Sequence, residues 1–139
     1  MNIHTLGQNL SALGQAGSAG LFFEVVPIPG EVDVLQVIVE DREECPIFLS
    51  ACEEQLLCIA YLARQDEIEP SKVAELNSAM LTANVNVPLS SFGLIEDRYV
   101  IFGALSTSSH LQDIVHELAV LSSNTIEAME VMQEFLSAE

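Results

Sequence analysis

The chain has 139 residues, half of them hydrophobic, and it carries 21 acidic against 4 basic residues, a formal net charge of −17. A chain of this length folds as one domain and buries roughly two thirds of its unfolded surface without a disulfide or a metal. So few dispersed basic residues disfavour nucleic acid and anionic lipid as partners, whereas the acidity favours either simple solubility or attraction of a basic protein.

The N-terminal half of the chain predicts a helix followed by strands. Residues 2–16 place apolar side chains at spacings of three and four, which indicates a helix, and residues 17–20 predict a flexible connector. The predicted strands are residues 21–26, residues 32–39 and residues 46–51. A turn at residues 27–30 should stop the first strand because its two prolines cannot donate to a ladder, and the nearly all-apolar second strand should be covered on both faces.

Residues 55–62 fit either a strand or a buried helix. Their composition does not decide, but their length and the short connectors on either side suit a meander, so we prefer a strand. A middle helix should begin near Pro70, with acidic residues at its start and one apolar face, and end by residues 86–88.

The segment from residue 88 to residue 109 predicts a hairpin and the start of the last helix. Glu96, Asp97 and Arg98 form a short charged tip, and residues 99–102 follow as a β-branched and aromatic strand. Ser109 and Gln112 have the spacing of a capping box, so the C-terminal helix should run from about residue 108 to residue 137.

That C-terminal helix would be about 45 Å long, more than one small domain spans. We expect it either to bend at Ser122–Asn124, where serine and asparagine favour competing hydrogen bonds, or to pack partly on something else. Its apolar seam is Leu111, Val115, Leu118, Thr125, Met129, Met132 and Leu136, widened by Ile114, Leu121, Ala128 and Phe135.

These elements predict a single α+β domain over residues 1–139. An antiparallel sheet of five to six strands carries an N-terminal helix, a middle helix and a long C-terminal helix, packed mainly on one face, in the order α-β-β-β-(β)-α-β-β-α. No apolar run approaches the ~20 residues that span a bilayer, and the N-terminus lacks the features of a secretory signal. We therefore expect a soluble, cytoplasmic protein without a transmembrane segment.

Side chains that could carry chemistry are sparse. Cys45, Cys52 and Cys58 form no CxxC pair and sit among apolar neighbours, where a thiol usually behaves as a small buried hydrophobe. His110 and His116 lie six residues apart on a helix and do not share a face. No nucleotide-binding or protease motif is present. We therefore predict no catalytic, cofactor-binding or metal-binding residue.

Arg42 is one of four basic residues and lies in the acidic tip Asp41–Glu44. Its guanidinium either pairs within that loop or presents its fork to a carboxylate of a partner. We take Arg42, Glu43 and Glu44, together with three residues of the last helix, as candidate partner-binding residues. Those three are Met129, Met132 and Leu136.

Three separated stretches resemble one known family. They are DREECPIFLSACEEQLLC (residues 41–58), PLSSFG (residues 88–93) and FGALS (residues 102–106), and they are similar to the YjfI family of small bacterial proteins. The resemblance implies no catalytic residues. Because genes of this family lie in some bacteria beside one for a membrane-stress protein like phage-shock protein A, it implies a protein partner linked to envelope stress.

The order of elements also resembles type III secretion chaperones, which are dimeric binders of segments of other proteins. We therefore predict a non-enzymatic, acidic protein-binding module, chaperone-like or an adaptor, that forms a homodimer and needs no cofactor. The alternative is a small enzyme or redox sensor that uses the thiol of Cys45, Cys52 or Cys58.

Overall fold

A computed structural model describes residues 2–13 and 22–137 and confirms the α+β prediction. Its helices are α1 (Ile3–Ala12), α2 (Val73–Ala83) and α3 (Leu111–Met132). Its strands are β1 (Phe23–Ile28), β2 (Val34–Val39), β3 (Ile47–Ala51), β4 (Gln55–Arg64), β5 (Ser91–Ile95) and β6 (Arg98–Ser106). Short 3₁₀ turns at Gln65–Glu67, Pro70–Lys72 and Gln133–Phe135 complete the order.

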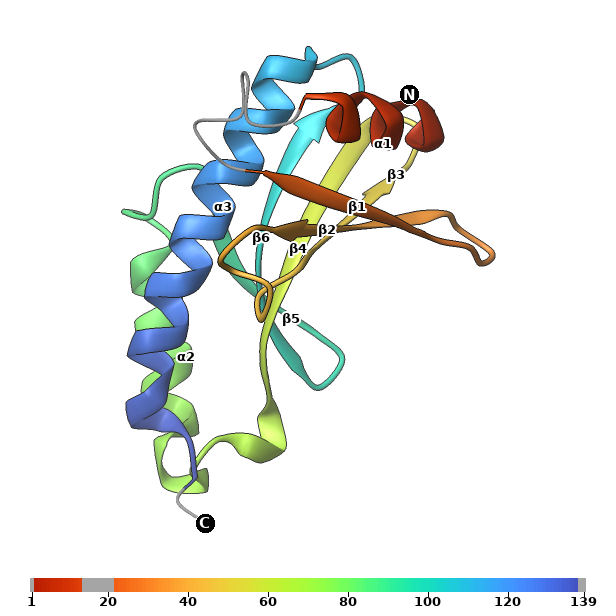
Figure 1. Cartoon of the computed structure of the whole chain (residues 1–139). Coiled ribbons are helices and arrows are strands. Elements are labelled where there is room, and N and C mark those ends of the chain that lie inside the picture. Colours follow the sequence, from red (N-terminus) through yellow and green to blue (C-terminus); the bar gives the residue numbers. More distant parts are fainter. Residues whose placement is uncertain (1, 14–21, 138–139) are drawn as a thin grey trace.

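All six strands form one antiparallel sheet in the order β1-β2-β3-β4-β6-β5. Alternate residues of each strand turn to the same face, and one of the two faces meets the helices. Figure 1 shows α3 running past the sheet, with its second half beside α2 and with α1 lying near the other end. The core between sheet and helices is built on fully buried side chains, among them Leu35, Ile47, Leu49, Leu56, Ile101, Leu118 and Leu121.

The sheet corrects two predictions. The first strand does not stop before Pro27 but continues to Ile28, with Pro27 opposite Leu35. The amide of Glu40 donates to the carbonyl of Phe22 at 3.0 Å, so the even-numbered residues of β1 point their backbone groups toward β2. The odd-numbered Pro27 therefore points its backbone nitrogen away from β2 at the outer edge of the sheet, where a proline removes no hydrogen bond between strands. The second strand is also not covered on both faces, because Leu35, Val37 and Val39 are buried while the residues between them are half-exposed.

Residues 55–62 are a strand, as preferred, within the longer β4. The predicted hairpin is present as β5 and β6, although Arg98 of the expected tip already belongs to β6. The predicted connector at residues 17–20, and Leu21 of the first expected strand, lie outside the described residues.

The C-terminal helix differs from its prediction at both ends. The capping box is absent: the N-cap is His110, without a side-chain hydrogen bond, and the Ser106 hydroxyl instead accepts from the amide of Ser108 at 3.1 Å. The helix remains continuous through Ser122–Asn124. Its 22 residues span about 33 Å instead of the predicted ~45 Å, and its second half lies beside α2 within the same domain. No helix in the described ranges 2–13 and 22–137 is long and apolar enough to cross a membrane.

One acidic side chain of α3 lies in the interior. Glu117 is 5 % exposed, and its carboxylate fills the space over Gly103 of β6, where an added Cβ would collide with it. Burial raises the pKa of Glu117, and the nearby His116 opposes this only in part. The fold therefore favours the protonated carboxyl and holds the carboxylate at a free-energy cost.

We predict that Glu117→Gln stabilises the protein above acidic pH. A raised pKa in the folded state adds stability that is fully present below the unfolded pKa of Glu and is lost as pH rises through the folded value. The gain in unfolding free energy of Glu117→Gln over the parent should accordingly grow as pH rises, as measured by urea denaturation across pH.

Glu130→Gln is the charge-matched control, because it removes one carboxylate from the exposed side of the same helix. An equal, pH-independent change in both variants would contradict a cost arising from burial of Glu117.

Candidate binding groove between two helices

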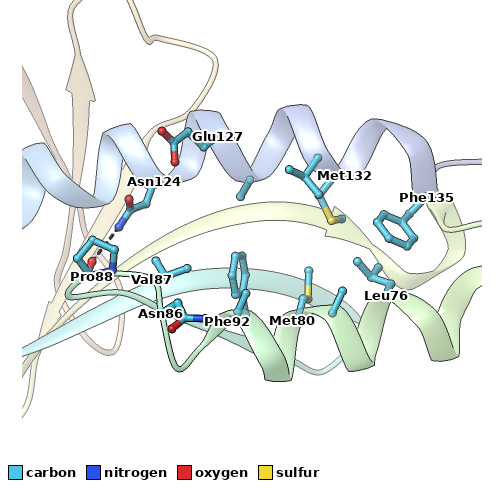
Figure 2. A pocket seen from close by; sticks show the side chains of 14 residues that line it. Leu76, Met80, Asn86, Val87, Pro88, Phe92, Asn124, Glu127, Met132 and Phe135 are labelled. Atoms are coloured by element: carbon cyan, nitrogen blue, oxygen red, sulfur yellow. Dashed lines mark hydrogen bonds between the residues drawn. The ribbon is translucent and has the colours of Figure 1, made fainter.

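An apolar groove lies between α2 and α3 and has a volume of about 460 Å³. Its floor and walls are Leu76, Ala79, Met80, Ala83, Phe92, Ala128, Val131, Met132 and Phe135, with Asn86, Val87, Pro88, Asn124 and Glu127 toward one end. Figure 2 shows Met80 and Met132 facing one another across it. Cavities of this size accept small ligands or a few side chains of a partner. We call it the α2–α3 groove.

Two asparagines fix one end of the groove. The Asn84 side chain accepts from the amide of Phe92 at 2.6 Å and donates to the carbonyl of Phe92 at 3.4 Å, which ties α2 to the edge of β5. Asn124 of α3 donates to the carbonyl of Pro88 at 2.9 Å and to the hydroxyl of Ser90 at 3.0 Å (Figure 2). Both helices are thus tied by hydrogen bonds to the β5 side of the sheet.

The other end is fixed by contacts with the segment before α2. The amide of Glu69 donates to the carbonyl of Phe135 at 2.8 Å, and Ile68 forms an isolated antiparallel bridge with Leu136. The Lys72 ammonium donates to the carbonyl of Glu134 at 2.7 Å. Because both ends are tied, the helices cannot close on each other without breaking these bonds, and the groove is a built feature.

The rim of the groove is apolar and acidic. Val131 is 59 % exposed, and Glu127 lies on the solvent side of α3. Neither α2 nor α3 contains a lysine or arginine, whereas α3 adds Glu130 beyond Glu127. The two thioethers can adapt to different apolar shapes. The groove thus suits an apolar segment that brings positive charge to its rim.

The predicted partner-binding residues separate into two places. The guanidinium of Arg42 crosses to α3 and donates to the hydroxyls of Ser122 and Ser123 at 3.1 and 3.2 Å. It therefore ties the β2–β3 loop to the helix, and its role in partner binding stays a prediction. Glu43 and Glu44 are exposed in that loop, far from the groove in sequence and outside its lining.

Of the three predicted residues on the last helix, Met132 lines the groove and is 3 % exposed. Met129 is half-buried and packs on the core, as does Leu136. Their role in partner binding stays a prediction. The sequence pattern did not single out Ala79, Ala83 and Phe92 as groove residues, although small residues one turn apart on α2 are the available signal for a helix face with room beside it.

The cysteines do not form a site. Cys45 and Cys58 are buried, and burial raises the pKa of both thiols, that of Cys58 to about 12. Nearby carboxylates act in the same direction, Glu44 on Cys45 and Glu117 on Cys58. Cys52 is exposed, contrary to the expected burial, and its thiol donates to the carbonyl of Gln55 at 3.4 Å. Within residues 2–13 and 22–137, no group of three His, Cys, Asp or Glu side chains could hold a metal.

We predict that a maleimide labels the native protein at Cys52 alone. Thiolates react and buried thiols with raised pKa do not, so labelling should stop at one equivalent and fall to none in Cys52→Ser. Intact-mass spectrometry before and after unfolding counts the modified thiols. Rapid native labelling at Cys58 would contradict the burial described for it.

A family profile described as "Uncharacterized protein conserved in bacteria (DUF2170)" matches residues 1–136. The chain is 26 % identical over 114 residues to the protein YjfI of Escherichia coli K12, covering 79 % of this chain and 84 % of YjfI. Both findings agree with the resemblance carried by the three sequence stretches.

Solved structures share the fold at lower identity. The crystal structure of YbjN from E. coli superposes with a TM-score of 0.66 at 16 % identity, covering 100 % of this chain and 97 % of YbjN. A chain of the HopA1–SchA chaperone–effector complex superposes with a TM-score of 0.59 at 16 % identity, covering 94 % of this chain and 98 % of that one. The chain is therefore similar in fold both to YbjN and to type III secretion chaperones.

Proposed function

The chain belongs to the bacterial protein family DUF2170 and shares its fold with type III secretion chaperones, and from this premise we propose that it is a non-enzymatic protein-binding module. The observation that carries the proposal is the α2–α3 groove, which is apolar, open to solvent and fixed at both ends. Its occupant is a segment of another protein, as for a chaperone or an adaptor.

The chemistry of the groove defines that segment. The partner segment is an amphipathic helix, and its apolar side chains, at helical spacing, fill the space between Leu76, Met80 and Met132. Flanking lysines or arginines meet Glu127 and the acidic surface of α3. With a net charge of −17, the protein also attracts a basic partner at a distance.

An enzymatic or redox role has less support. A cysteine nucleophile needs a thiolate, and burial together with nearby carboxylates opposes thiolate formation at Cys45 and Cys58. The groove itself offers mainly amide and apolar groups, with one carboxylate at its rim. A cytoplasmic location remains a prediction that rests on the hydropathy of the sequence, and a partner from envelope stress remains a prediction that rests on the sequence resemblance.

We predict that Ala79→Phe weakens binding of a basic amphipathic helical peptide. The peptide carries leucines at positions i, i+3 and i+7 with flanking lysines, and the introduced phenyl ring occupies the space that its leucines need. Fluorescence anisotropy should show saturable binding to the parent that weakens by more than about tenfold, or about 1.4 kcal/mol, in Ala79→Phe. Higher salt should weaken binding to the parent.

Ala74→Phe is the matched control, since it places the same ring at another exposed position of α2 outside the groove. It should bind the peptide like the parent. A second peptide with glutamates in place of the lysines tests the acidic rim. Equal binding of the basic peptide to both variants, or no binding to the parent, would remove the groove as its site.

A further inference from the structure

The face of the sheet that points away from the helices is apolar. Strand alternation places on it a set of apolar side chains from five strands, of which Val26, Ile28 and Tyr61 are 38 %, 38 % and 39 % exposed. The uncharged polar residues Gln36 and Ser50 lie among them. Half-exposed members of the set are Val34, Ile38, Phe48, Leu57, Ile59 and Phe102. None of the three described helices packs on this face, because their buried apolar residues all belong to the core on the other side. We call it the open face.

The open face is an ordered surface. The rings of Phe48 and Tyr61 meet edge to face, with centroids 5.6 Å apart, and the guanidinium of Arg98 lies over the Tyr61 ring at 5.3 Å. Gly93 of β5 lets the ring of Phe102 lie across that strand, at 3.1 Å from where a Cβ would be. These contacts hold the aromatic side chains in fixed positions on the sheet.

Charge is nearly excluded from this face. In the described strands its acidic residue is Glu24 on β1, and its basic residues are Arg98 and Arg64 near the opposite edge. The acidic residues of the chain lie mainly on the helices and loops. For two copies that each carry −17, the open face is the surface on which close approach meets the least like charge.

Size and symmetry favour a second copy as the occupant. Six strands of about six residues form a sheet with a flat area of roughly 500 Å². The accessible surface of its side chains and of the adjoining turns is larger than this flat area and approaches the ~800 Å² that each partner contributes to a standard interface. A two-fold axis parallel to the strands places β1 of one copy over β5 and β6 of the other. The strand register places Glu24 level with Tyr61 and Val100 across the sheet, two residues along the strands from the level of Arg98. Because this axis keeps each residue at its level along the strands, it brings Glu24 of each copy near Arg98 of the other.

We propose that the open face is the dimer interface of this protein, with two sheets packed face to face and Glu24 paired across it with the Arg98 of the second copy. The interface is isologous and resembles a β-sandwich core. It leaves the α2–α3 groove of each copy on the outside, so the proposal stands independently of the groove.

The test is the mass of the full chain in solution by sedimentation velocity at micromolar concentration. The parent should sediment as a dimer of the 15.1 kDa chain, and added salt should strengthen association by screening the net charge. Val26→Glu and Tyr61→Glu should each weaken the dimer by more than about 100-fold, because each places a carboxylate from each copy in an apolar interface. Leu81→Glu, with the same added charge at a site 71 % exposed on α2, should leave the dimer intact.

A charge swap tests the register without placing a charge in the apolar centre. Arg98→Glu and Glu24→Arg should each weaken association, and the double variant should restore it, while circular dichroism confirms that all variants are folded. A monomeric parent would overturn the proposal. A second outcome would also overturn it, namely a dimer that survives both Val26→Glu and Tyr61→Glu but dissociates when the helices are changed. The helix variants are Leu81→Glu and the double variant Met129→Glu with Leu136→Glu, and loss of the dimer in either would place the interface on the helices.

Discussion

The packing of α3 on β4 and β6 is the contact on which the rest of the structure depends. Leu118 and Leu121 of the helix are fully buried against the central strands, and Glu117 finds room because Gly103 has no side chain. This arrangement fixes the direction of α3 relative to the sheet. The second half of α3 lies beside α2, and the two helices together line the α2–α3 groove.

The α2–α3 groove follows from that geometry. Phe92 of β5 lines the space between the two helices, and Ala79, Ala83 and Ala128 are too small to fill it. Asn84, Asn124 and Lys72 hold the helices in place by hydrogen bonds to backbone groups, so a gap persists where larger apolar side chains would have closed it. The groove thus keeps a fixed shape at the expense of packing density.

Charge and apolar surface are divided between the two sides of the protein. The helical side carries carboxylates around an apolar groove, whereas the open face of the sheet carries almost none and presents aromatic and β-branched side chains. Three helices of this length can cover one face of a six-stranded sheet but not both. The apolar side chains of the uncovered face can be removed from water only by association with another molecule. A surface that carries little charge suits association between copies whose net charges otherwise repel each other.

The sequence by itself determined the order of the elements and the α+β class, because short apolar runs such as residues 47–51 and helical spacing in residues 111–132 are local patterns that the fold obeys. It did not determine strand order, so nothing local showed that Pro27 lies on an outer edge or that Arg42 reaches Ser122, 80 residues away. Apolar strand residues predict burial but do not say which face is covered. Only the tertiary structure decided which face is covered, because the positions of α2 and α3 depend on contacts between residues far apart in the chain. The α2–α3 groove depends on the same contacts.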